Sequence, residues 1–147
     1  MKTKQLLLTL LTFLLPLASW ADVWQDPETK VNYEFTVGQN EAKVSSSRNL
    51  SGDIAILSKF TVDGNEYTVT SIGEWAFMSC TSMTNITIPS SITIIGNYAF
   101  QYCRGITVID IPSSVNSIGQ YAFQNCSALT TVTIPSSVTE HSTIVLK

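Results

Sequence analysis

The chain reads Ile72-Gly73-Glu74-Trp75-Ala76-Phe77, then Ile95-Gly96-Asn97-Tyr98-Ala99-Phe100, and then Ile118-Gly119-Gln120-Tyr121-Ala122-Phe123. The three segments start 23 residues apart. A fixed period in this range is typical of stacked structural units, each of which buries its apolar face against its neighbours. The sequence therefore predicts a solenoid, a class of fold that usually works by offering a surface rather than by enclosing a catalytic pocket.

Other residues keep the same step. In one unit Ile86 and Ile88 alternate with Thr87, which is the pattern of a half-buried strand, and Pro89 ends the strand because it lacks an N–H to donate. Stacking would place equivalent residues above one another at about 4.8 Å. We therefore expect internal ladders of identical residues, among them Phe77, Phe100 and Phe123, and also Cys80, Cys103 and Cys126.

These segments resemble a known family. The core pattern L-x-x-L-x-L of leucine-rich repeats is matched by Met83-x-x-Ile86-x-Ile88, Ile106-x-x-Ile109-x-Ile111 and Leu129-x-x-Val132-x-Ile134. The continuation P-S-S-I/V-x-x-I-G-x-x-A-F-x-x-C is similar to the 23-residue BspA-like, or Treponema-type, subclass, and the match covers residues 72–138.

The resemblance implies a β-rich right-handed solenoid of leucine-rich-repeat type, with a sheet on one side and short 3₁₀ or irregular segments on the non-sheet side. It also implies a secreted or surface-exposed protein linked to adhesion and protein binding. No catalytic residues come with the family, so the resemblance implies a non-enzymatic protein.

The first residues have the pattern of a signal peptide. Lys2 and Lys4 precede an apolar run, residues 6–17, and the small residues Ser19 and Ala21 suit a cleavage site after Ala21. The apolar run is shorter than the roughly 20 residues of a membrane span, although an uncleaved anchoring helix is the alternative. We expect residues 1–21 to be removed on export, leaving a secreted, cell-surface or periplasmic protein with no membrane insertion.

Charge excludes one class of partner. Residues 22–147 carry six basic and eleven acidic side chains, a net charge of −5, without any basic patch that could bind nucleic acid. Between Thr70 and Thr139 the charged residues are Glu74, Arg104 and Asp110. Such a neutral, hydroxyl-rich surface suits hydrogen bonding to neutral partners, but Thr and Ser also fit exposed strands and turns for their own reasons.

The repeat weakens at both ends. Residues 22–69 are predicted to form an N-terminal β cap with hairpins, one of them turning at residues 62–65, and Ile54-Ala55-Ile56 is predicted to be a divergent first rung. Residues 70–139 hold three leucine-rich repeats. At residues 140–147 the next I-G-x-x-A-F is replaced by His141-Ser142-Thr143-Ile144-Val145-Leu146, which indicates either a degenerate closing rung or a truncated array.

Candidate chemistry is sparse. Three cysteines in an exported protein suggest disulfides, but their strict step of 23 favours buried thiols in one ladder. A metal site of these cysteines with His141 matches no zinc spacing. The chain has one His, no nucleophile elbow and no phosphate-binding glycine loop, so we expect no enzyme activity, no metal and no cofactor.

The best candidate site is aromatic. Trp75, Tyr98 and Tyr121 share one repeat position, two residues before the ladder phenylalanines, and in an extended local geometry they would point outward. Beside the amides of Asn97 and Gln120 they could bind a glycan or a peptide with flat ring faces and hydrogen bonds. The alternative is that the rings merely cover neighbouring rungs.

A second, weaker candidate is the outer face of the sheet, represented by Thr87, Asp110 and Thr133. Leucine-rich-repeat proteins often bind partners there, although any exposed strand favours Thr. Taken together, the sequence predicts an adhesion-type module that binds a host or matrix protein, or a glycan. The alternative is a structural spacer, or a fragment of a longer surface repeat protein, with no ligand of its own.

Overall fold

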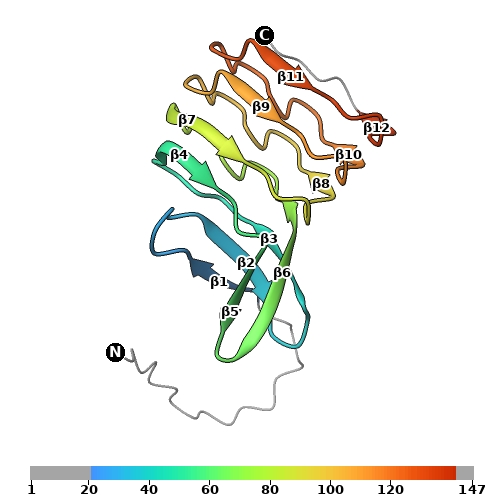
Figure 1. Cartoon of the computed structure of the whole chain (residues 1–147). Helices are drawn as coiled ribbons and strands as arrows, with labels where there is room; N and C mark the ends of the chain where they lie inside the picture. Colours follow the sequence, from blue (N-terminus) through green and yellow to red (C-terminus); the bar gives the residue numbers. More distant parts are fainter. Residues whose placement is uncertain (1–20, 142–147) are drawn as a thin grey trace.

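The computed structural model describes residues 21–141, which form a β-solenoid without a helix (Figure 1). The rungs rise from the N-terminal strands at the bottom of Figure 1 to the C-terminal strands at the top, but β5 and the start of β6 lie at the bottom, below β4. They are β1 Ala21–Gln25, β2 Asn32–Thr36, β3 Glu41–Val44, β4 Ser51–Ala55, β5 Lys59–Val62, β6 Asn65–Ile72, β7 Ser82–Thr87, β8 Ile94–Ile95, β9 Val108–Asp110, β10 Ser117–Ile118, β11 Thr131–Thr133 and β12 Glu140–His141.

Each rung has two strand sides. On one side β4 pairs with β7 and β9 pairs with β11, in both cases parallel. On another side the end of β6 and the two-residue strands β8, β10 and β12 form a second parallel ladder. Its register places Ile72, Ile95 and Ile118 opposite one another, which is the 23-residue step of the sequence.

The third side consists of turns, where the resemblance implied 3₁₀ or irregular segments. Here backbone hydrogen bonds within a rung alternate with hydrogen bonds between rungs. Within one rung Cys103 N donates to Phe100 O at 3.0 Å, and between rungs Phe100 N donates to Ala122 O at 2.8 Å. In the rung before, Phe77 N donates in the same way to Ala99 O at 2.8 Å. The turn segments are thus joined by backbone bonds between rungs although they are not strands, which satisfies backbone groups that burial would otherwise penalise.

The predicted phenylalanine ladder is confirmed. Phe77, Phe100 and Phe123 are fully buried, and their rings stack with centroids 5.3 and 5.5 Å apart. These separations exceed the strand spacing of about 4.8 Å because parallel rings favour an offset arrangement. The ladder runs through the centre of the repeats and supplies much of their apolar core.

The N-terminal hairpins are present as predicted. β2 pairs antiparallel with β3, and β5 pairs antiparallel with β6 across the turn at Asp63 and Gly64. The cap joins the solenoid through the parallel pair of β3 and β6, and Ile54 of β4 lies opposite Ile86, as expected for a first rung.

Strand β1, which pairs with β2, was not predicted, because its apolar residues Val23 and Trp24 are adjacent rather than alternating. Its first residue, Ala21, is also the only residue of the predicted signal peptide that the structure describes. At the other end β12 begins the next rung in register with β10, and residues 142–147 of the predicted closing rung lie outside the described part of the chain.

The cysteine ladder consists of buried thiols, as predicted. The thiols donate hydrogen bonds to backbone carbonyls of the preceding rung. Cys103 Sγ donates to Phe77 O at 3.1 Å, and Cys126 Sγ donates to Phe100 O at 3.0 Å. Burial raises the pKa of Cys126 to about 11, and burial together with the neighbouring thiols raises the pKa of Cys103 as well. Burial also raises the pKa of Tyr33, in the cap, to about 12.

These shifts predict alkaline instability. Because the folded-state pKa values lie above the unfolded ones, the stabilising contribution is complete below the ordinary cysteine pKa of 9.0 and is lost as pH rises through about 11. We expect the urea midpoint to fall steadily from about pH 9 upward, and the fall to be shallower in Cys126→Ala. A midpoint that stays constant to about pH 11, or equal slopes in the two proteins, would contradict this account.

A ladder of serines gives a matched pair of variants. Ser114 Oγ donates to Ile92 O at 2.7 Å, whereas Ser91 Oγ is buried without a partner among the described residues, because the rung before it is the β5–β6 hairpin. We expect Ser114→Ala to lower the free energy of unfolding by about 1 kcal/mol and Ser91→Ala to leave it unchanged or raise it. Urea denaturation of both variants checks this, and equal losses would mean that Ser91 has a partner too.

Candidate functional site

Trp75, Tyr98 and Tyr121 form a continuous surface feature, here called the aromatic strip. Their ring centroids are 6.3 and 5.4 Å apart, with interplanar angles of 18° and 17°. Trp75 is 48% exposed and the two tyrosines are half-buried. The sequence therefore correctly predicted which rings come together, and Trp75 is the ring that a partner can reach most easily.

The backbone that presents these rings differs from the prediction. An extended geometry was expected, but this is wrong: Trp75, Tyr98 and Tyr121 have φ values of 53°, 55° and 56°, in the left-handed region. The conformation is unfavourable for residues with a side chain, and bonds between rungs compensate, such as Trp75 N to Asn97 O at 3.0 Å. Apart from its recurrence at one repeat position, no signal in the sequence indicates this conformation.

Some of the side-chain amides beside the aromatic strip already make hydrogen bonds within the protein. Asn97 Oδ1 accepts a hydrogen bond from the backbone N–H of Gln120 at 2.8 Å, so this oxygen holds two rungs together. Gln101 and Gln124 bond to each other through their side chains. The side chain of Gln120 is exposed and has no partner among the described residues, so it is the amide best placed to meet a ligand.

On the sheet face Thr87, Asp110 and Thr133 are all exposed. Asp110 and Thr133 are register partners in β9 and β11. Thr87 and Asp110 also border a hollow of about 170 Å³, whose other lining residues are Asn85, Ile86, Ile88 and Val108. The structure thus brings the three predicted residues onto one face, but the hollow beside Thr87 and Asp110 is small, carries one charge and does not include Thr133.

A cavity at the junction of cap and solenoid, here called the cap cavity, was missed by the sequence reasoning. It has a volume of about 510 Å³ and lies at the Trp75 end of the aromatic strip. Its walls come from β1, β2, β3 and the segments after β3 and β6: Val23, Asn32, Glu34, Lys43, Val44, Ser45, Ser46, Gly73, Glu74 and Trp75. Seven of these residues come from the cap, which has no repeats, and only Gly73, Glu74 and Trp75 belong to the first repeat, so no spacing could have revealed the cavity.

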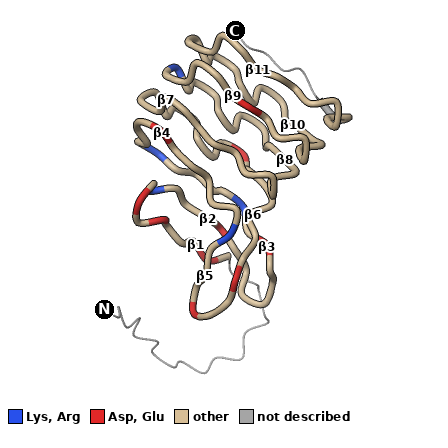
Figure 2. The backbone as a smooth tube through the Cα atoms, viewed as in Figure 1, with Lys and Arg blue, Asp and Glu red and all other residues tan. Residues whose placement is uncertain are grey.

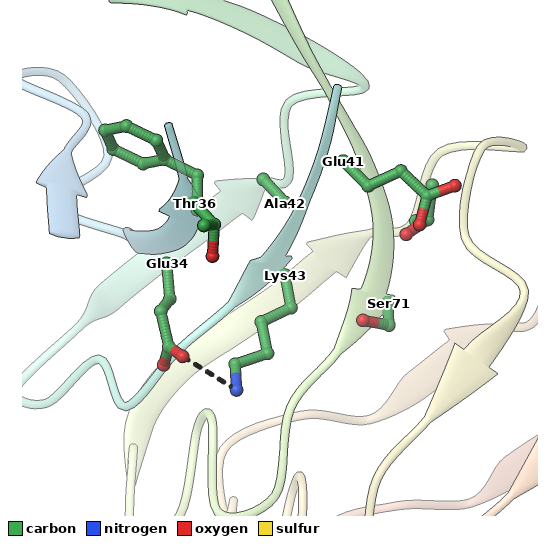
Figure 3. A pocket seen from close by; sticks show the side chains of 8 residues that line it. Glu34, Thr36, Glu41, Ala42, Lys43 and Ser71 are labelled. Atoms are coloured by element: carbon green, nitrogen blue, oxygen red, sulfur yellow. Dashed lines mark ion pairs between the residues drawn. The ribbon is translucent and has the colours of Figure 1, made fainter. Parts of the chain in front are cut away.

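An ion pair forms one wall of the cap cavity. Lys43 Nζ lies 2.9 Å from Glu34 Oε1, and Figure 3 shows the two side chains pointing toward one another across β2 and β3. The same pair borders a smaller cavity of about 200 Å³ that Thr36, Glu41 and Ser71 help to line. The pair neutralises two of the three charges on the cap cavity and leaves Glu74 as the third.

Charges are concentrated in the cap (Figure 2). Between β6 and β12 the charged residues are Glu74, Arg104 and Asp110, and the guanidinium of Arg104 lies over the ring of Tyr102, 5.5 Å from its centroid. Within residues 21–141 no three side chains of His, Cys, Asp or Glu gather as a metal site would require. In the same range, no helix has the length and hydrophobicity needed to cross a membrane.

Comparisons with known proteins agree with this architecture. The profile of BspA type leucine rich repeat regions matches residues 56–146 with six copies. A leucine-rich repeat protein from Bacteroides capillosus is 31% identical, with a TM-score of 0.72 over 81% of this chain and 87% of that one. No curated protein matches the sequence significantly.

Two other solved structures are longer than this chain. A leucine-rich repeat protein from Bacteroides ovatus is 35% identical, with a TM-score of 0.68 over 74% of this chain and 29% of that one. A leucine rich cell surface protein from Faecalibacterium prausnitzii is 27% identical, with a TM-score of 0.65 over 81% of this chain and 32% of that one. From the family profile and the shared solenoid, the chain belongs to the BspA-type leucine-rich repeat proteins.

Proposed function

We propose that this protein is an exported, non-catalytic binding module of the cell surface that holds a protein or glycan partner on the aromatic strip. The observation that carries the proposal is Trp75: a large aromatic ring, 48% exposed, at a repeated position and beside an open cavity. Exposed aromatic rings of this kind are enriched among the residues that dominate binding energy. The name of the F. prausnitzii protein, a cell surface protein, supports the location.

A spacer without a ligand is the second candidate, and one observation favours it. Tyr98 and Tyr121 are half-buried and stack on each other, so part of their role is to cover the rungs. A spacer would need these rings for packing alone. The two functions therefore differ in what removal of Trp75 does to binding.

Binding arrays separate the two candidates. The purified protein is applied to immobilised glycans and extracellular-matrix proteins, together with the double variant Trp75→Ala/Tyr98→Ala. We expect saturable binding that the double variant weakens about 30-fold or more, since truncation of an aromatic hot spot costs about 2 kcal/mol or more. Val37→Ala, in the turn after β2 and 67% exposed, serves as the control and should bind normally. Absence of binding to every probe would favour the spacer.

Export is proposed from residues 1–21, whose sequence has a basic start, an apolar run and small residues before the cleavage point. Cleavage after Ala21 would give a protein that begins at Asp22. N-terminal sequencing of the protein recovered outside the cytoplasm tests this. Recovery of the chain in the cytoplasm with Met1 or Lys2 at its start would contradict export.

A further inference from the structure

We propose that the cap cavity holds one residue of a neutral oligosaccharide, stacked on the indole of Trp75, so that the partner of the aromatic strip is a glycan without acidic groups. The inference rests on the proposed function and specifies its ligand. Four features of the cavity carry it: the open face of the Trp75 ring, polar side chains without hydrogen-bond partners, the net negative charge, and backbone amides that are already hydrogen-bonded.

One face of the Trp75 indole is open toward the cap cavity. Tyr98 stacks on one side of the indole, with centroids 6.3 Å apart. The cap cavity lies toward β1, β2 and β3 and includes no residue of the Tyr98 rung, so it meets the side of Trp75 that Tyr98 leaves open. The C–H face of a sugar ring fits a flat aromatic face of this kind. Val23 of β1, 60% exposed, adds an apolar contact from the cap.

The polar groups of the cavity suit hydroxyls. Ser45 and Ser46 hydroxyls and the Glu74 carboxylate have no hydrogen-bond partner among the described residues, whereas Asn32 is already bonded through both atoms of its amide. A few convergent polar groups beside an apolar wall are the usual lining of a small-molecule site. The volume of about 510 Å³ falls within the range of about 300–1,000 Å³ that such sites occupy.

Charge selects against acidic ligands. The ion pair of Glu34 and Lys43 is internally neutral, so Glu74 gives the cavity a net charge of −1. Residues 22–147 as a whole carry a net charge of −5. A sialylated, uronic or sulfated sugar would meet like charge on approach and in the cavity, which lowers both its association rate and its affinity.

The backbone of the cavity selects against an extended peptide. Ser45 N donates to Asn32 O, Gly73 N donates to Val44 O at 2.8 Å, and Trp75 N donates to Asn97 O. Because these amides are already paired, a peptide cannot add as another strand along the part of the wall that Ser45, Gly73 and Trp75 form, and strand addition is the usual source of affinity for an extended chain. Recognition must come from side chains, and the side chains here are a flat ring, hydroxyls and a carboxylate.

The experiment compares three classes of probe by isothermal titration and tryptophan fluorescence. The probes are neutral cello-, malto-, manno- and chito-oligosaccharides, the acidic sialyl-oligosaccharides and hyaluronan oligomers, and enzymatically deglycosylated matrix proteins. The variants are Trp75→Ala, Trp75→Phe, and Val23→Trp or Ser46→Phe, each of which fills the cavity. Val37→Ala is the exposed control, and circular dichroism checks that every variant is folded.

We expect at least one neutral oligosaccharide to bind and the acidic ones not to. Trp75→Ala and each folded cavity-filling variant should weaken binding at least tenfold, Trp75→Phe less, and Val37→Ala not at all. Strip-dependent binding of deglycosylated protein or acidic glycan instead would overturn the inference and leave the proposed function standing. Neutral-glycan binding that ignores the cavity-filling variants would also overturn it. Failure of every probe would overturn the inference and the proposed function together.

Discussion

Replacement of Phe100 by alanine is expected to lower the free energy of unfolding by about 3–5 kcal/mol. Phe100 is fully buried and its ring lies between those of Phe77 and Phe123, so truncation removes apolar burial and two stacking contacts and leaves a void between rungs. A domain of this size has a total stability of about 5–15 kcal/mol. The variant should therefore lose at least about a fifth of its stability, seen as a lower midpoint in urea denaturation.

Phe100→Leu is the matched control for this prediction. Leucine keeps much of the side-chain volume, so its cost should be well below that of alanine. Both variants should keep the m-value of the parent protein if the unfolded state is unchanged. A loss below about 1 kcal/mol in Phe100→Ala, typical of an ordinary substitution, would show that the ladder is not the core of the repeats.

The second large effect is expected at Gly96. A Cβ added there would lie 2.7 Å from Glu74 N and 2.8 Å from Gly73 C, which are backbone atoms of the preceding rung and cannot swing aside. Gly96 N also donates to Ile72 O at 2.8 Å, so the same position holds the two rungs together. Gly96→Ala must push the rungs apart, and we expect a loss of about 3 kcal/mol, at the upper end of overpacking effects.

Gly64→Ala separates steric crowding from the general effect of replacing a glycine. Gly64 lies in the β5–β6 turn with φ +81° and nothing within 4 Å of an added Cβ. Its substitution should cost about 1–2 kcal/mol from backbone strain alone. If Gly96→Ala proves no more destabilising than Gly64→Ala in parallel urea titrations, the close approach of the rungs is not a constraint on the fold.

The candidate site was only partly predictable. The period of the sequence identified Trp75, Tyr98 and Tyr121 as one column, and the structure places them in one stack. The period could not show that the amide oxygen of Asn97 accepts a hydrogen bond from Gln120 N, because that bond depends on the separation of two rungs. Nor could it find the cap cavity, because most of its walls come from cap segments without a repeat.

The predicted features differ from the unpredicted ones for a physical reason. A repeat makes the same local contacts many times, so the apolar positions of one unit determine which residues face the core in all of them. That is why the sequence alone was sufficient for the solenoid, the Phe77–Phe100–Phe123 ladder and the buried thiols. The hairpin at Asp63 and Gly64 was equally local and was predicted for the same reason.

What the tertiary structure decided depends on contacts between distant segments. The left-handed backbone at Trp75 is stabilised by a bond to Asn97 in the next rung, and the open side of its ring is set by where β1, β2 and β3 lie. The charge of the cavity follows from the pairing of β2 with β3, which places Lys43 against Glu34. The sequence by itself determined the stack and the column of aromatic rings, because both repeat locally. Only the folded chain decided which ring is accessible and what surrounds it, because those features arise where the repeats meet the non-repetitive cap.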